Sequence, residues 1–331
     1  SHEPAIPQFT DTVIVVAGLS AIGKALTDER VHHAEYFSQL TGLEIGETIT
    51  PQAVISMLTH PQGGLKNIPS IARRIALLNQ ADTPELRSLA GGMTRPLMEH
   101  FHSVVVGSFE QNILHTFEHT AGIILAAGES TRFGSPKQLL DWKGKPFVRH
   151  IAETALHSGL WPVVVVTGFC AAEVKSCLKD LPITIVHNPA YQQGQSASIK
   201  AGFNFLFPSP KFDRNSVEFG GVRVGVGSAI FLLSDQPQIP SEVIRALTES
   251  HARGLHAIIA PLVHEERRAN PVLFDQVTFP DLLQLTGDIG GRAIFSKYNG
   301  EYIPWHDDIL LLDVDKPEDY QRLVENEKLK R

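Results

Sequence analysis

IILAAGESTRFGSPK, residues 123–137, passes from an apolar run into a polar loop that carries two glycines and two cations. A short apolar run that ends in turn-forming residues is typical of a buried strand. Gly128 lets the chain turn sharply and expose consecutive N–H groups, which bind phosphate oxygens. Arg132 and Lys137 supply the positive charge that a triphosphate requires. The stretch predicts a phosphate-binding loop after a strand, although an ordinary loop with two surface cations shares the pattern.

Strand-like and helix-like segments alternate after this loop. Strands are expected at 162–168, 183–187, 229–235, 257–261, 271–274 and 308–314, and helices at 146–157, 171–180, 196–207, 241–252, 290–298 and 317–325. This order predicts an α/β fold in which a mostly parallel sheet carries helices on both faces. Ligands of such sheets bind outside the carboxyl ends of the strands, so the polar residues that follow the strands are the first candidates for a site.

Aspartates follow two of the expected strands. Asp235 comes directly after the apolar run AIFLLS, and Asp313 and Asp315 alternate at the end of the strand expected at 308–314, so they would share one face. Mg²⁺ prefers one or two carboxylates together with substrate phosphates. Asp235 and Asp315 are therefore candidate magnesium ligands, and the alternative for each is an aspartate that caps a turn or a helix.

The part of the chain before residue 110 predicts a second, smaller α/β segment. Its expected strands end near Gly18, Asn79 and Phe109, and the polar residues 110–120 are expected to form a helix or a linker. This places the domain boundary between residues 117 and 118. Gly18, Gly23 and Lys24 have P-loop spacing, but Ala25 stands where the motif needs a hydroxyl, so a working phosphate loop is not expected there.

Composition limits the other classes of function. The 331 residues suggest about two domains. A formal net charge of −7 argues against non-specific nucleic-acid binding. The sequence contains neither an apolar run of the roughly 20 residues that span a bilayer nor a signal-peptide pattern, and Cys170 and Cys177 are expected to be reduced thiols. We therefore expect a cytoplasmic protein without a membrane or nucleic-acid partner.

The loop and five later segments resemble the MobA-like nucleotidyltransferases. Residues 125–137 resemble the LAAGxSxRMGxxK form of the molybdenum cofactor cytidylyltransferases, with Phe133 in place of Met. The further matches, in order, are NPAYQQGQSASIKAG (188–202), SDQP (234–237), RRANPVLF (267–274), LTGDIGGRAIF (285–295) and LLDVDKPEDY (311–320). The resemblance covers about residues 119–331 and implies a Rossmann-like sheet of the nucleotide-diphospho-sugar transferase type.

The resemblance implies Mg²⁺-dependent transfer of CMP from CTP to the phosphate of molybdenum-bound molybdopterin, which gives molybdopterin cytosine dinucleotide and pyrophosphate. It implies catalytic roles for Arg132, Lys137 and Asp235, and metal binding by Asp235 and Asp315. The residues expected to contact the substrates are Leu125, Ala126, Ala127, Gly128, Asn188, Gln195, Ser196, Ser198 and, on the side of the second substrate, Asn270. Guanylyl-transferring relatives typically read LAGG at the loop, so Ala127 favours CTP over GTP.

Residues 11–109 resemble part of the YqeC-like family of selenium-dependent hydroxylase accessory proteins. The matching features are VVAGLSAIGKAL (15–26), VHHAEYFSQLTG (31–42), ITPQAVISMLTHPQGGLKNIP (49–69), LLNQAD (77–82) and VVVGSF (104–109). The resemblance implies a P-loop-NTPase-like domain without its own phosphate loop, and hence upstream sequence that this chain omits. A molybdenum hydroxylase would then be a client of the fused protein.

Two other readings stay open at this point. The chain could transfer a nucleotide, GTP included, to another phosphate such as a sugar phosphate or methylerythritol phosphate. It could also be a carrier that delivers a finished molybdenum cofactor without catalysis, in which case replacing Lys137 or Asp235 by alanine should leave delivery intact.

Overall fold

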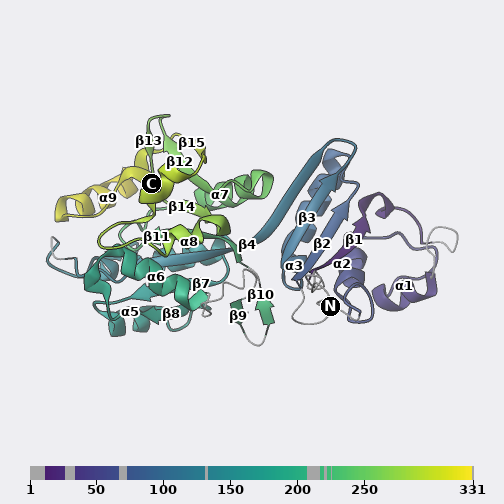
Figure 1. The fold of residues 1–331 in the computed structure, drawn as a ribbon, viewed down its shortest axis with the longest axis horizontal. Coiled ribbons are helices and arrows are strands. Elements are labelled where there is room, and N and C mark those ends of the chain that lie inside the picture. Colours follow the sequence, from purple (N-terminus) through teal and green to yellow (C-terminus); the bar gives the residue numbers. More distant parts are fainter. Residues whose placement is uncertain are drawn as a thin grey trace, which may run out of the picture. The chain divides into compact units, whose positions relative to one another are not determined.

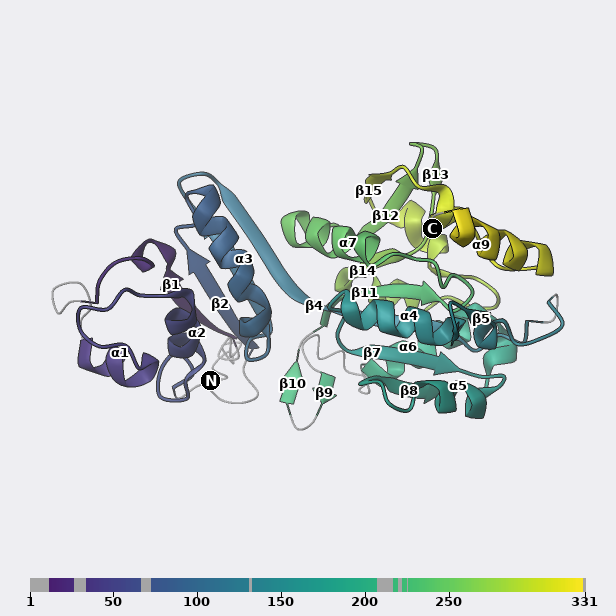
Figure 2. The same ribbon diagram turned by 180° about the vertical axis from the view of Figure 1, so that it is seen from behind.

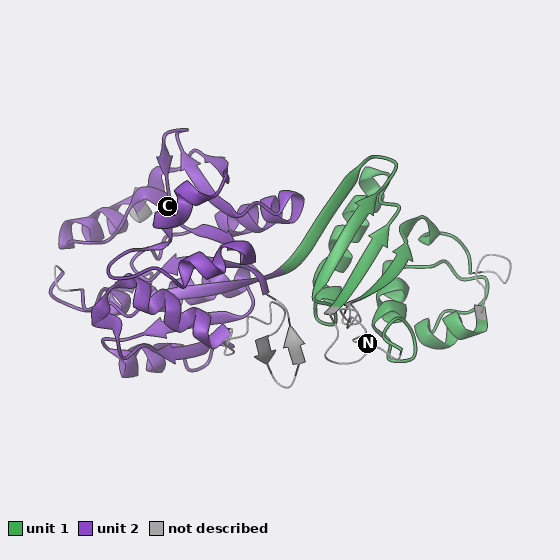
Figure 3. Ribbon diagram, in the orientation of Figure 1, with its two compact units in different colours: residues 1–118, 215–225 green, residues 119–214, 226–331 purple. Residues whose placement is uncertain are grey.

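The computed structural model describes residues 12–26, 34–66, 73–130, 133–206, 217–219, 222–224 and 226–329. The chain divides into two compact units, residues 1–118 with 215–225 and residues 119–214 with 226–331 (Figures 1 and 3). Within the described ranges, no helix combines the length and the apolar character that crossing a membrane would require.

The first unit is built on three parallel strands. They are β1 (Thr12–Gly18), β2 (Arg73–Asn79) and β3 (Ser103–Ser108), in that spatial order. The beginning of β4 (Ile113–Ala126) adds an antiparallel fourth strand beside β3. A short antiparallel pair, β9 (Val217–Phe219) with β10 (Val222–Val224), also falls within this unit.

The helices of the first unit are α1 (Ala34–Thr41), α2 (Pro51–Thr59) and α3 (Pro84–Met98). Thr50 and Thr83 cap α2 and α3, because each hydroxyl accepts from a backbone N–H in the first turn and each helix has proline at its start. The buried cluster joins the helices to one face of the sheet, including Ala76, Leu78 and Val104.

Residues 110–120 do not form the expected helix or linker. From Ile113 onward they belong to β4, so that expectation is wrong. β3 offers backbone hydrogen-bond partners to residues 113–118. The β-branched residues Ile113 and Thr116 favour the extended conformation. Farther along, from His119, β4 pairs with strands of the second unit.

The second unit contains a mixed sheet around the carboxyl half of β4. β7 (Val163–Thr167) and β11 (Val226–Leu233) flank β4 in parallel, and β8 (Thr184–His187) extends the sheet beyond β7. On the other side β14 (Val272–Asp275) runs antiparallel to β11 and to β12 (Ile258–Val263), which also pairs with β13 (Arg267–Arg268) and β15 (Gly300–Trp305). The expected α/β class is therefore confirmed, with antiparallel strands toward one side.

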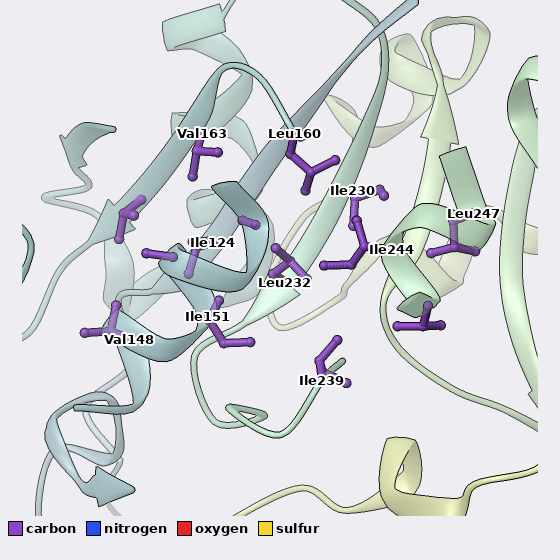
Figure 4. Packing of buried hydrophobic residues seen from close by; sticks show 14 of the residues in the cluster. Ile124, Val148, Ile151, Leu160, Val163, Ile230, Leu232, Ile239, Ile244 and Leu247 are labelled. Carbon is purple, nitrogen blue, oxygen red and sulfur yellow. The ribbon is translucent and has the colours of Figure 1, made fainter. Parts of the chain in front are cut away.

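Helices cover both faces of this sheet (Figures 1 and 2). On one face, α4 (Phe147–His157), α5 (Ala171–Leu178) and α7 (Ser241–Gly254) pack in one buried cluster with strand residues such as Ile124 and Ile230 (Figure 4). On the other face lie α6 (Gln195–Leu206) and α8 (Phe279–Leu282), whose Phe203 and Phe279 rings are 4.7 Å apart. Each such fully buried apolar side chain contributes about 1.5–3 kcal/mol.

Two expected elements near the C-terminus take other forms. The apolar run at 308–314 forms a 3-10 helix, Asp308–Leu311, instead of a strand, because Asp307 accepts from the backbone N–H of Ile309 and starts a turn. The helix expected at 290–298 is also a 3-10 helix, Gly291–Lys297. The remaining elements are β5 (Asp141–Trp142), β6 (Lys145–Pro146), α9 (Pro317–Leu329) and 3-10 turns at Leu19–Ala21, Lys137–Leu139, Tyr191–Gln193 and Gln276–Thr278.

Candidate functional site

The loop after β4 is fixed by hydrogen bonds between side chains and backbone. Ser130 Oγ accepts from the backbone N–H of Lys137 at 3.0 Å, and Gln138 Nε2 donates to the carbonyl of Gly128 at 3.2 Å. The left-handed residues of the loop are Ser130 (φ 56°) and Gly134 (φ 80°), and not Gly128 as the sequence suggested. A Cβ added at Gly128 would meet no atom within 4 Å, so the missing side chain leaves the loop backbone open to a ligand. Arg132 lies outside the described residues.

Lys137 lies between two carboxylates from distant parts of the chain. Its Nζ is 2.9 Å from Oδ2 of Asp235, which follows β11, and 2.7 Å from Oδ1 of Asp315, which precedes α9. Burial lowers the pKa of Lys137, but the charges of both aspartates and their hydrogen bonds outweigh burial, so the pKa lies above its ordinary value. Lys137 is therefore cationic at neutral pH. One ammonium and two carboxylates leave this cluster with a net negative charge.

A third carboxylate, Asp313, stands next to this cluster. Gln236 Nε2 donates to Oδ1 of Asp313. Partial burial and the nearby charges of Asp235 and Asp315 raise the pKa of Asp313, against the opposing influence of Gln236 and Arg292. The expected strand is absent here, and Asp313 and Asp315, which were expected to share one face, line different cavities.

The first of these, the loop cavity, has a volume of about 480 Å³. It is bounded by the β4 loop, the start of α6 and the loop after β11. Its walls include Leu125, Ala127, Gly128, Ser130, Phe133, Lys137, Gln138, Tyr191, Gly194, Gln195, Ser198, Leu233, Ser234, Asp235, Asp288 and Asp315. The phosphate-binding loop expected from the sequence, the lysine and two of the aspartates thus share one concave surface, which suits a polyanionic ligand when further positive charge is supplied.

The second cavity, which we call the aromatic cavity, has a volume of about 250 Å³. Leu125, Gln195 and Leu233 line both cavities, so the two are neighbours. The other walls of the aromatic cavity are Ile199, Phe231, Asn270, Val272, Phe274, Gly290, Gly291, Arg292 and Asp313. Asn270, expected on the side of a second substrate, therefore lies in this cavity and not in the loop cavity.

The start of α6 is tied to the loop at residues 287–291. Ser196 Oγ donates to the carbonyl of Gly287 at 2.7 Å, and the backbone N–H of Gln195 donates to Asp288 Oδ1 at 3.4 Å. Gly194 has a φ of 101°, and a Cβ there would come within 2.5 Å of the carbonyl carbon of Gly287. These contacts fix one wall of both cavities.

Three expected contact residues serve the scaffold in this structure. Asn188 is 4% exposed, donates to Ser198 Oγ at 3.1 Å and accepts from the backbone of Ala190. Ser196 is 3% exposed and holds Gly287, and Ala126 is 1% exposed within β4. None of these three lines either cavity described above. Their roles in ligand binding stay predictions.

Sequence reasoning did not single out Tyr191, Asp288 and Arg292, which line the two cavities. All three lie inside segments whose pattern had already been identified, 188–202 and 285–295. The missing signal was spatial: neither segment shows locally that it approaches the end of β4. The available signal was that these polar residues belong to segments that match the family pattern, which is enough to make them candidates.

The donor set fits a magnesium ion that shares its coordination with a ligand. Among the residues that the structure describes, no group of three or more His, Cys, Asp or Glu side chains is arranged to hold a metal. Asp235 and Asp315 nevertheless converge on one point, the position of Lys137 Nζ. Two carboxylates suit Mg²⁺, which takes its other ligands from phosphates and water.

Residues 122–302 match the family described as the MobA-like NTP transferase domain, and residues 1–35 match the YqeC protein family. The YqeC protein of Escherichia coli is 32% identical over 99 residues, which cover 30% of this chain and 39% of that protein. The chain therefore spans well under half of this relative.

Two further relatives are similar to parts of the chain. Nicotine blue oxidoreductase of Paenarthrobacter nicotinovorans is 28% identical over 213 residues, which are 61% of this chain and 95% of that protein. A probable molybdenum cofactor guanylyltransferase of Bacillus cereus is 38% identical over 87 residues, 26% of this chain and 42% of that protein.

Solved structures share the fold over more than half of the chain. A homologue of Rv0371c from Mycobacterium sp. strain JC1 aligns with a TM-score of 0.51 at 27% identity, over 62% of this chain and 96% of that one. A nucleotidyl transferase from Methanothermobacter aligns with a TM-score of 0.52 at 18% identity, over 64% of this chain and 99% of that one. The nucleotidyltransferase fold expected from the sequence is thereby confirmed.

Proposed function

The chain belongs to the MobA-like NTP transferase domain family, and from this premise we propose that it transfers CMP from CTP to the phosphate of molybdenum-bound molybdopterin. The products are molybdopterin cytosine dinucleotide and pyrophosphate. Molybdenum travels on the substrate in this proposal and is not held by the protein.

The observation that carries the proposal is the meeting of Lys137, Asp235 and Asp315 beside the open backbone of Gly128. A triphosphate in the loop cavity needs donors for its oxygens and positive charge for its phosphates. The loop backbone supplies the donors, and Lys137 supplies one charge, which the phosphates would share with the aspartates. Arg132 is proposed to add a second charge.

The reaction needs little covalent help from the protein. An oxygen of the acceptor phosphate attacks the α-phosphorus of CTP and forms a new P–O bond, while the bond between the α-phosphorus and the bridging oxygen breaks and pyrophosphate leaves with its electrons. Positioning and charge neutralisation therefore account for catalysis. The two cavities meet at Leu125, Gln195 and Leu233, which is where the acceptor and the α-phosphate would face each other.

Asp235 and Asp315 would hold Mg²⁺ in this scheme. When bound, the ion neutralises phosphate charge and polarises the phosphoryl oxygens. Lys137 would then turn from the aspartates toward the departing pyrophosphate and stabilise its charge. Lys137, Asp235 and Asp315 together carry a net negative charge when no metal ion is bound, and this supports the division of roles.

CTP is preferred over GTP in the proposal because Ala127 stands where guanylyl-transferring relatives typically have glycine. Ala127 lines the loop cavity next to Gly128. The guanylyltransferase relative makes GTP the natural competitor. The identity of the base is therefore a direct object of the experiment that tests this function.

The first unit is proposed to be an accessory domain, residues 1–117, joined to the transferase domain, residues 118–331. The chain is similar to YqeC in this part, and we propose, as the resemblance to the accessory-protein family implies, that a molybdenum hydroxylase is the client of the fused protein. Such a client would bind the product in the same compartment, which we propose to be the cytoplasm.

The test measures pyrophosphate release by the full chain with Mg²⁺ and molybdenum-loaded molybdopterin, using CTP, GTP or ATP, and identifies the nucleotide product by mass. Release with CTP that Asp235→Asn abolishes and Glu325→Gln retains is the expected result; Glu325 is an exposed residue of α9. Pyrophosphate release with GTP and not with CTP would show that the nucleotide substrate is GTP. No release with any nucleotide, from folded protein and competent acceptor, would overturn the proposal in favour of another phosphate substrate or a carrier.

A further inference from the structure

Arg292 is a cation of the aromatic cavity that the roles above do not use. It is the second residue of the 3-10 helix Gly291–Lys297 and lines the cavity together with Asn270 and Asp313. Across the described part of the chain, Arg292 forms no hydrogen bond or ion pair, although the carboxylate of Asp313 belongs to the same cavity. A guanidinium at a cavity wall without a partner is available to an incoming anion, which it can bind through two parallel hydrogen bonds.

A pair of glycines places Arg292 at this wall. A Cβ added at Gly291 would lie 2.6 Å from Cζ of Phe274, and one added at Gly290 would collide with Oε1 of Gln195. Because neither glycine has a side chain, the backbone packs directly against two residues of the cavity. The hydrogen bond from Ser196 Oγ to the carbonyl of Gly287 fixes the same loop from the other end.

The rest of the aromatic cavity is mostly apolar. Its apolar walls are Leu125, Ile199, Phe231, Leu233, Val272 and Phe274. The Phe231 and Phe274 rings are 5.4 Å apart and tilted, so they form one continuous aromatic wall. A small cavity with aromatic walls and few polar groups suits a flat ring system whose orientation those polar groups fix.

The neighbours of Arg292 place it toward the loop cavity. Arg292 and Asp313 line the aromatic cavity together, and Asp313 is two residues before Asp315 of the loop cavity. Gly290, two residues before Arg292, packs against Gln195, which lines both cavities. An anionic group that binds Arg292 therefore lies at the side of the aromatic cavity that faces the proposed metal and the α-phosphate. This is the position that an attacking phosphate must occupy.

We propose that Arg292 binds the phosphate of the acceptor, and that the aromatic cavity thereby selects acceptors in which a phosphate is carried by a ring system that can pack against Phe231 and Phe274. The inference rests on the proposed function and assigns the substrate-selecting residue of its second site. Arg292 is a specificity-determining residue in this scheme, because it touches the acceptor and leaves the nucleotide to the loop cavity.

The test is equilibrium binding of molybdopterin to the full chain, with dephosphorylated molybdopterin as the second probe. Arg292→Ala is expected to weaken the binding of molybdopterin roughly 10- to 100-fold, the usual effect of a lost charged hydrogen bond, and Arg292→Lys to weaken it less. Binding of dephosphorylated molybdopterin and of CTP should be the same in Arg292→Ala as in the wild type. Arg253→Ala, at a position on α7 that is 68% exposed, serves as the matched control and should bind all three ligands normally.

Each of three results overturns the inference: wild-type protein that does not bind molybdopterin, Arg292→Ala that binds it as tightly as the wild type, or Arg292→Ala that loses both pterin probes equally. Binding that depends on Arg292 in a protein that transfers no nucleotide would instead overturn the proposed function and leave the acceptor site standing. Arg292 is exposed, so the variant is expected to fold, which circular dichroism checks.

Discussion

Lys137 and Asp235 form an ion pair of 2.9 Å although 98 residues separate them in the chain. Lys137 comes from the loop after β4 and Asp235 from the loop after β11, and these two strands are parallel neighbours. The carboxyl ends of neighbouring parallel strands lie at the same edge of a sheet, so the two loops must meet. Asp315 completes the cluster from the segment before α9.

Replacing Lys137 by alanine should lower kcat/KM for nucleotidyl transfer by about 10²- to 10³-fold, because it removes a charge aimed at the departing pyrophosphate. The measurement is pyrophosphate release with CTP, Mg²⁺ and molybdenum-loaded molybdopterin. Lys175→Ala, an exposed lysine of α5, is the control and should keep full activity. Equal activity of both variants would show that Lys137 is a structural partner of the aspartates and takes no part in catalysis.

Replacing Asp235 by asparagine should weaken the binding of Mn²⁺ in the presence of CTP by roughly 10-fold or more, because a charged ligand becomes a neutral one. Paramagnetic resonance of free Mn²⁺ measures this without turnover. Glu325→Gln removes one negative charge elsewhere and should bind Mn²⁺ like the wild type. A Mn²⁺ affinity unchanged in Asp235→Asn would remove this aspartate from the proposed metal site.

Replacing Asp313 by asparagine should stabilise the folded protein at pH values above the ordinary pKa of an aspartate. The raised pKa of Asp313 means that the folded state disfavours the charged carboxylate, so its unfavourable contribution appears as the pH rises from about 4 through the raised pKa. Asparagine still accepts from Gln236 and carries no charge. The gain should stay below about 1 kcal/mol, because solvent reaches Asp313 and screens it.

Urea unfolding at pH 5 and pH 8 tests the Asp313 prediction. The difference in the free energy of unfolding between Asp313→Asn and the wild type should be larger at pH 8. A gain that is the same at both pH values would mean that packing, and not charge, explains it. A loss of stability at pH 8 would contradict the expected sign.

Replacing Asp275 by alanine should lower the free energy of unfolding by about 3 kcal/mol, because it strips a buried partner from a buried histidine. Asp275 Oδ2 lies 2.8 Å from Nε2 of His251, and the two residues are 8% and 2% exposed. Asp275 Oδ1 also caps the following turn, since it accepts from the backbone N–H of Val277 at 2.8 Å. Asp307→Ala is the matched control, because it removes the equivalent cap at Ile309 from an exposed aspartate, and it should cost about 1 kcal/mol. Similar losses in both variants, measured by chemical denaturation, would reduce the role of Asp275 to capping.

Local patterns predicted the elements whose residues determine their own conformation. The helix expected at 146–157 matches α4 to within one residue, and the helix expected at 241–252 falls within α7, because the spacing of apolar residues along a helix is a local signal. The β4 loop and the position of Asp235 after a strand could also be predicted, since an apolar run followed by polar residues needs no distant partner to be recognised.

Elements that depend on a partner could not be predicted in the same way. Residues 113–120 are polar enough to suggest a linker, and β3 makes them a strand by offering backbone hydrogen bonds. The apolar run at 308–314 has strand composition, but its first residues form a 3-10 helix that Asp307 caps. Composition records side-chain preference, whereas pairing depends on which backbone lies alongside.

The sequence by itself determined the α/β class, the loop chemistry and the set of residues from which a site could be made. Only the tertiary structure decided that Lys137 meets Asp235 and Asp315, that Asn188 and Ser196 turn inward, and that Arg292 stands at a second cavity. The physical reason is that hydrogen bonds and ion pairs act over a few ångströms in space, whereas Lys137 and Asp315 are 178 positions apart in the chain and carry no local signal of their proximity.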